Sequence, residues 1–139
     1  VTNIKVIPRF FCIAFNSYLM LCLSFKSSAA AALGEFEQGR PLIEKIRALH
    51  PEYKILLTFF SPSGYEVRKN YEGADIVCYL PFDKPRNVSK FLNIVNPRMV
   101  FFIKYEFWKN YLDELHKRRI PVYSISSIVR KNQIVFKCY

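Results

Sequence analysis

Hydrophobic positions along the chain follow two alternating patterns, namely continuous apolar runs of strand length and apolar residues at helical spacing. The continuous runs are KILLTFF at 54–60, IVCYL at 76–80, MVFFI at 99–103 and PVYSIS at 121–126. Uninterrupted apolar runs of this length are typical of strands that are buried on both faces of a sheet. The pattern therefore predicts four strands.

The segments between these runs predict helices. Helices are expected over 38–50, from Ser63 to about Asn70, from Pro85 onward and over 107–119. Pro41 is expected in the first turn of the first of them, and Ser63 and Glu66 have the spacing of a capping box. The inward faces of the last two helices are expected to comprise Val88, Phe91, Leu92 and Val95, and Trp108, Tyr111, Leu112 and Leu115, respectively.

The spacing of the strands indicates the fold. Their centres lie about 22 residues apart, which is the length of one strand, one helix and two short loops. Buried strands that alternate with helices predict an α/β fold, a Rossmann-like three-layer sandwich with a mostly parallel sheet. One more strand is expected within residues 20–33, although the SSAAAA at 27–32 is poor strand material.

The most apolar stretch lies near the amino terminus, at residues 10–25. It is shorter than the roughly 20 residues that span a bilayer, and Asn16 and Ser17 interrupt it. We expect a membrane-associated helix or a core helix here, and not a cleaved signal peptide. We therefore expect two parts of the chain, an apolar segment at 1–32 and a Rossmann-like domain at 33–139.

The net charge of +10 comes from the two ends of the chain. Residues 1–34 carry three basic residues and no acidic one, and residues 98–139 carry nine basic residues against three acidic ones. Such an excess favours an anionic partner such as a phosphate-bearing ligand, a membrane surface or nucleic acid, although a solvated basic surface is the alternative. The four cysteines lack CxxC spacing, so neither a zinc site nor a disulfide framework is supported.

Ligands of open parallel sheets bind beyond the carboxyl ends of the strands, so the residues after each strand are the candidates for chemistry. Gly34 and Glu35 follow the expected first strand, and a carboxylate beside a glycine can act as a general base on an approaching hydroxyl. The alternative role of Glu35 is to complement the dipole of the following helix.

Three further strand ends carry candidate residues. Ser61, Ser63 and Gly64 can bind an anion at a helix start, or the serines can serve as caps. Glu106 lies among aromatic residues, as a perturbed carboxylate or as one half of an ion pair. Arg130 can hold a phosphate or be ordinary surface charge. The loop Pro81–Asp83 also follows a strand, and GxGxxG, P-loop, HExxH and GxSxG motifs are absent from the sequence.

Several strings of residues together resemble the 3-deoxy-D-manno-octulosonic acid (Kdo) transferase family. They are LGEFEQGRPLIEKI at 33–46, ILLTFFSPSGYEVRKNYEGAD at 55–75, YLPFDKPRNVSKFL at 79–92, KYEFWKNYLDEL at 104–115 and the segment 126–133. Members of this family are inverting glycosyltransferases of the two-domain GT-B fold. The resemblance implies that the chain is the amino-terminal, acceptor-binding half and lacks the carboxyl-terminal donor domain.

The resemblance also implies a reaction and a set of residues. Glu35 would be the catalytic base that deprotonates a hydroxyl of the lipid A precursor for attack on CMP-Kdo, the donor substrate. The acceptor cleft would be lined by Gly34, Ser61, Ser63, Gly64, Glu106 and Arg130. The family needs no metal or other cofactor for this step and works at the cytoplasmic face of the bacterial inner membrane, in lipopolysaccharide biosynthesis. The chain alone is expected to be inactive.

The residue pattern by itself leaves a second hypothesis open. A non-catalytic, flavodoxin-like module could use its basic ends to bind an anionic membrane surface or nucleic acid. Under that hypothesis, Glu35 would have no part in any reaction.

Overall fold

A computed structural model describes residues 18–23, 29–103 and 108–125 of the chain. The strands are β1 (Tyr18–Leu23), β2 (Lys54–Phe59), β3 (Ile76–Tyr79), β4 (Pro97–Ile103) and β5 (Val122–Ile125). The helices are α1 (Ala29–Leu49), α2 (Pro62–Arg68), α3 (Pro85–Val95) and α4 (Lys109–Lys117). The four strands predicted from continuous apolar runs are thus confirmed.

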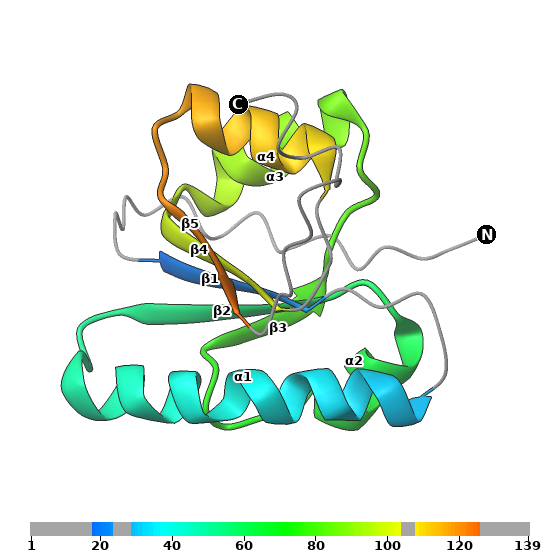
Figure 1. The fold of residues 1–139 in the computed structure, drawn as a ribbon, viewed down its shortest axis with the longest axis vertical. Coiled ribbons are helices and arrows are strands. Elements are labelled where there is room, and N and C mark those ends of the chain that lie inside the picture. Colours follow the sequence, from blue (N-terminus) through cyan, green and yellow to red (C-terminus); the bar gives the residue numbers. More distant parts are fainter. Residues whose placement is uncertain (1–17, 24–28, 104–107, 126–139) are drawn as a thin grey trace, which may run out of the picture.

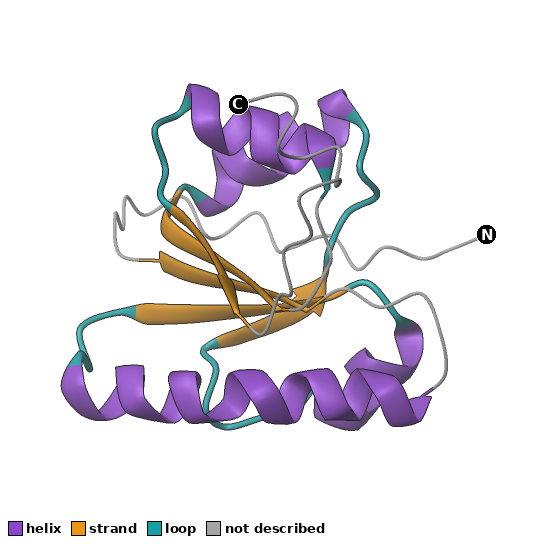
Figure 2. Cartoon of the chain, viewed as in Figure 1, coloured by secondary structure: helices purple, strands orange, loops and turns teal. Residues whose placement is uncertain are grey.

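The five strands form one parallel sheet in the order β3-β2-β1-β4-β5. Helices α1 and α2 cover one face of the sheet, and α3 and α4 cover the other (Figure 1). Figure 2 shows the same three layers, with the strands between two layers of helices. The predicted Rossmann-like α/β sandwich is therefore the observed fold.

The core consists of two clusters, one on each face of the sheet, because successive side chains of a strand point to opposite faces. In β2, Ile55, Leu57 and Phe59 belong to the cluster under α1, and Leu56 belongs to the cluster under α3 and α4. The predicted apolar face of α3 is confirmed, since Val88, Phe91, Leu92 and Val95 are all buried.

The prediction of a helix over 10–25 is wrong for Tyr18–Leu23, which form the central strand β1. This strand pairs with β2 on one side and β4 on the other. The strand expected within 20–33 therefore exists, but it begins earlier, at Tyr18, and ends at Leu23, well before the alanine run begins a helix at Ala29. The predicted boundary between 32 and 33 falls inside α1, so both sides of that boundary contribute to one sandwich.

Two predicted helix starts are also corrected. Helix α1 begins at Ala29 and contains Pro41 in its interior, not in its first turn. Helix α2 is preceded by Ser61 as N-cap, whose side chain makes no capping hydrogen bond. Glu66 forms an ion pair with Lys69 (2.7 Å) instead of completing a capping box.

A cluster of charged residues connects the carboxyl-terminal end of α1 to the sheet. Arg47 donates a hydrogen bond to the carbonyl oxygen of Gly73 (3.1 Å) and forms an ion pair with Asp75. The Asp75 carboxylate also accepts hydrogen bonds from the Ile55 amide (2.8 Å) and the Lys54 ammonium (3.2 Å). Burial would raise the pKa of Asp75, but these bonds outweigh burial and leave the pKa below its usual value. The cluster lies at the amino ends of β2 and β3, so it holds α1 along the sheet from the end opposite Gly34.

Candidate functional site

The sheet has a topological switch point between β1 and β4. From β1 the chain moves outward to β2 and β3, and from β4 it moves outward in the other direction to β5. Ligands of open α/β sheets bind beyond the carboxyl ends of the strands at such a point. The segments that directly follow β1 and β4, residues 24–28 and 104–107, lie outside the described residues. The described part of this edge comprises the start of α1, the loops after β2 and β3, and the start of α4.

Gly34 and Glu35 were expected between the first strand and the helix over 38–50. They lie instead in the second turn of α1. A rise of 1.5 Å per residue puts Gly34 about 8 Å along the helix from Ala29. Gly34 is exposed, and a Cβ added to it would meet no neighbouring atom within 4 Å. The side chain of Glu35 lies outside the described part of the chain.

Helix α1 is anchored beside these two residues. Phe36 is 0% exposed and packs edge-on against Tyr71, with ring centroids 4.9 Å apart. The guanidinium of Arg68 lies 4.5 Å from the centre of the Phe36 ring and bonds Glu37 (2.9 Å). These contacts join α1 to α2, so the backbone at residues 34 and 35 rests on a well-packed support at this edge.

The predicted serine cluster after β2 is a compact turn. The hydroxyl oxygens of Ser61 and Ser63 are 2.7 Å apart and share a hydrogen bond, and both residues are half-buried. Gly64 is buried within α2, a helix of 7 residues. The two hydroxyls are thus close together at the carboxyl edge, and their contact with a ligand stays a prediction.

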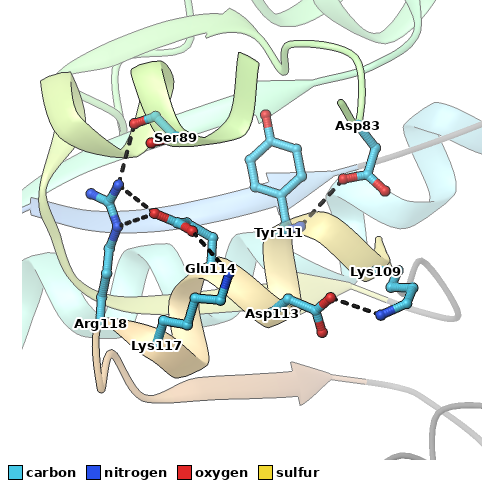
Figure 3. Close-up of polar contacts among 8 residues, drawn as sticks. All are labelled: Asp83, Ser89, Lys109, Tyr111, Asp113, Glu114, Lys117 and Arg118. Atoms are coloured by element: carbon cyan, nitrogen blue, oxygen red, sulfur yellow. Dashed lines mark hydrogen bonds and ion pairs between the residues drawn. The ribbon is translucent and has the colours of Figure 1, made fainter. Parts of the chain in front are cut away.

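The loop after β3 is bound to the start of α4 by a set of hydrogen bonds that the sequence did not reveal. The carboxylate of Asp83 accepts bonds from the backbone amides of Asn110 (3.3 Å) and Tyr111 (3.2 Å). In return, the Asn110 side chain donates to the Asp83 carbonyl oxygen (3.0 Å), and the Tyr111 hydroxyl donates to that of Pro81 (3.0 Å). Figure 3 shows Asp83 facing the first turn of α4.

Asp83 therefore supplies a capping carboxylate to α4 from a distant loop. A carboxylate there satisfies amides that the helix leaves free and complements the positive end of its dipole. The sequence offered one indication of this contact. Asp83 follows β3 and α4 follows β4, so both lie at the carboxyl edge of the sheet. Its partners lie 27 and 28 residues further on, and no local sequence pattern connects residues so far apart.

The opposite end of α4 is fastened to α3. Arg118 forms an ion pair with Glu114 of α4 (2.7 Å) and donates a hydrogen bond to the Ser89 carbonyl oxygen of α3 (3.3 Å) (Figure 3). Together with the Asp83 cap, this contact holds the helix pair at both ends. The loop after β3 and the start of α4 consequently form one rigid unit at the carboxyl edge.

Aromatic residues cover the described part of this edge. Phe60 lies 4.8 Å from Trp108 and 6.0 Å from Phe82, measured between ring centroids. Trp108 was predicted within a helix over 107–119, but it is the N-cap residue of α4 and is half-buried. Glu106 and Arg130 lie outside the described residues, so their predicted roles stay predictions.

The described ranges contain neither a candidate metal site nor a candidate membrane span. No group of three His, Cys, Asp or Glu side chains there is arranged to hold a metal ion. Likewise, none of the helices in those ranges combines the length and the apolar character needed to cross a bilayer.

Cys78 is a free thiol, and burial raises its pKa to about 12, so it stays protonated near neutral pH.

Comparisons with known proteins identify the family of this chain. A model of the family described as 3-Deoxy-D-manno-octulosonic-acid transferase (kdotransferase) matches residues 28–136. The chain belongs to the Kdo transferase family. The resemblance inferred from the residue strings is thereby confirmed, and the matched range includes every candidate site residue.

Two curated relatives carry the name 3-deoxy-D-manno-octulosonic acid transferase. The relative from Haemophilus influenzae is 32% identical over 93 residues, which cover 66% of this chain and 22% of the relative. The relative from Aquifex aeolicus is 29% identical over 104 residues, which cover 73% of this chain and 29% of the relative. The chain thus matches less than a third of the length of these Kdo transferases.

Proposed function

We propose that this chain is the acceptor-binding half of an enzyme that transfers Kdo from CMP-Kdo to the lipid A precursor. Membership of the Kdo transferase family supports the reaction class. Glu35 is the general base, and the observation that carries this role is the exposed glycine directly before it in α1. The enzyme acts at the cytoplasmic face of the inner membrane, where a basic surface suits a bisphosphorylated lipid.

The glycine at position 34 needs a reason, because glycine within a helix costs about 1 kcal/mol relative to alanine. Its backbone φ is not positive, so the conformation does not require glycine. Packing does not require it either, since a Cβ there would meet no described atom within 4 Å. We infer that the glycine makes room for a ligand, because a bulky acceptor that must reach Glu35 would pass close to this position.

The proposed reaction is a displacement at the anomeric carbon of Kdo. The Glu35 carboxylate takes the proton of the acceptor hydroxyl while the hydroxyl oxygen forms a bond to the anomeric carbon. The bond from that carbon to the phosphate oxygen of CMP breaks, and CMP leaves with the electron pair. Attack opposite to the leaving group inverts the configuration. The step needs no metal, and the acceptor is held by Gly34, Ser61, Ser63, Gly64, Glu106 and Arg130.

Transfer of Kdo by the full-length gene product is the direct test of the proposal. Radiolabelled CMP-Kdo and the lipid A precursor are expected to yield a labelled glycolipid that chromatography separates from both substrates. Residues 1–139 alone are expected to yield none, because the relatives are more than three times as long as the matched region. Product formation by residues 1–139 would contradict the expectation that this half is inactive alone. No product from the full-length protein would contradict the proposed reaction.

Gly34→Ala tests the reason given for the glycine. The substitution is expected to stabilise α1 by about 0.5–1 kcal/mol, because alanine has the higher helix propensity, and yet to raise KM for the acceptor several-fold. Hydrogen exchange of α1 amides reports the first effect and initial transfer rates report the second. Lys45→Ala, on an exposed position further along the helix, is the matched control and should change neither. A Gly34→Ala protein with unchanged acceptor KM would remove this support for the site.

A further inference from the structure

Phe82 is a large aromatic side chain that the fold leaves in solvent. It is 58% exposed and lies in the loop between β3 and α3. The other large hydrophobic residues of the described ranges that are exposed lie within helices or in β5: Leu49, Val67, Ile94 and Tyr123. Phe82 is thus the one at the carboxyl edge, where a ligand of this fold binds.

The loop that carries Phe82 is held by several hydrogen bonds. The carbonyl oxygen of Phe82 accepts bonds from the Lys84 amide (2.7 Å) and the Asn87 side chain (3.3 Å). Its two neighbours, Pro81 and Asp83, are bound to α4 by the bonds described above. The fold therefore holds the backbone that carries the ring in one place, which lowers the ordering cost of a contact with a ligand.

A cation and further rings lie beside Phe82. The ammonium of Lys84 is 6.0 Å from the centre of the Phe82 ring, and the Phe60 ring lies 6.0 Å away. Lys84 has no acidic partner among the described residues. An exposed ring next to an ammonium that has no acidic partner in the described ranges suits a ligand with an apolar face and an anionic group. Sugars that carry a phosphate or a carboxylate combine these two properties.

We propose that Phe82 and Lys84 form a subsite for an anionic sugar, in which Phe82 stacks against the ring and Lys84 pairs with the anionic group. This rests on the proposed function, because both substrates of that reaction are anionic sugars. The phosphorylated acceptor and the carboxylate-bearing donor share this chemistry. Phe82 and Lys84 contact the ligand through their side chains, whereas the loop is held through its backbone and by Asp83, so substitutions at the two positions leave the loop intact.

Equilibrium binding tests the subsite without any need for turnover. Dissociation constants of the full-length protein are measured by calorimetry, separately for the bisphosphorylated lipid A precursor, the same lipid without phosphates, and CMP-Kdo. Phe82→Leu and Lys84→Met are each expected to raise the Kd of one anionic sugar about tenfold, which corresponds to the loss of a single stacking or charge contact. Phe82→Tyr and Lys84→Arg should restore most of the affinity.

The affected ligand identifies the source of the anionic group. If the acceptor is bound here, Lys84→Met weakens the bisphosphorylated lipid and leaves the dephosphorylated lipid unchanged; if the donor is bound, only CMP-Kdo is weakened. Ile94→Ala and Lys90→Met, at exposed positions of α3 away from its start, are matched controls without an expected effect. Unchanged Kd values for every ligand in both variants would overturn the subsite, whereas the transfer assay decides the proposed function independently.

Discussion

The full-length protein carrying Glu35→Gln is expected to transfer Kdo with a kcat about 10²–10⁴-fold below that of the wild type. Glutamine has nearly the shape of glutamate but cannot accept the proton of the attacking hydroxyl. The Kd of the acceptor should stay within about twofold, because the loss concerns proton transfer and not binding. Single-turnover rates with saturating CMP-Kdo measure the chemical step directly.

Glu37→Gln is the matched control for this variant. Glu37 lies two residues further along α1, and its carboxylate pairs with Arg40 (3.1 Å) and Arg68 (2.9 Å). The side chains of these pairs are 30–47% exposed, so the substitution should lower stability by about 1 kcal/mol at most and leave kcat unchanged. A Glu35→Gln protein with wild-type kcat would exclude Glu35 as the base. It would instead favour the alternative role, in which Glu35 only complements the dipole of α1.

Phe36→Ala is expected to destabilise the sandwich by about 3–5 kcal/mol, the usual cost of removing a buried aromatic side chain. Phe36 is 0% exposed in the cluster under α1, and its ring contacts Tyr71 and lies beneath the Arg68 guanidinium. The truncation removes all three contributions at the junction of α1 and α2. Hydrogen exchange of β2 amides measures the effect within this sheet, even if other parts of the protein unfold separately.

Phe82→Ala is the control for Phe36→Ala, because it removes the same side chain from an exposed position. Phe82 is 58% exposed, so its truncation should change the stability of the sandwich by about 0.5 kcal/mol or less. Equal losses for the two variants would show that the burial difference between Phe36 and Phe82 does not hold in solution. A small loss for Phe82 combined with weaker sugar binding would separate its stabilising role from its binding role.

Most of the sandwich could be predicted from local patterns. A strand covered by helices on both faces has to be apolar at nearly every position, and KILLTFF at 54–60 meets this condition over β2. The helix after Pro85 was equally clear, since Val88, Phe91, Leu92 and Val95 recur at helical spacing and are buried as expected. For these elements the local pattern and the final packing agree.

The first strand and first helix were harder to predict. The apolar stretch at 10–25 has no periodicity that separates a strand from a buried helix. Tyr18–Leu23 become a strand because β2 and β4, far along the chain, provide hydrogen-bonding partners on both sides. The alanines that follow are strong helix formers, and they extend α1 to Ala29, which carries Gly34 and Glu35 into a helix and not a loop.

The alternation of strands and helices, the parallel sheet and the family could all be inferred from the residues alone, because they depend on apolar periodicity and on contiguous strings of residues. The folded structure was needed to show that Asp83 caps α4, that Phe36 is buried and that Phe82 is exposed. Each of these outcomes depends on partners from other elements. Strand order and helix packing bring those partners together, and no local pattern along the chain encodes which distant residues will meet.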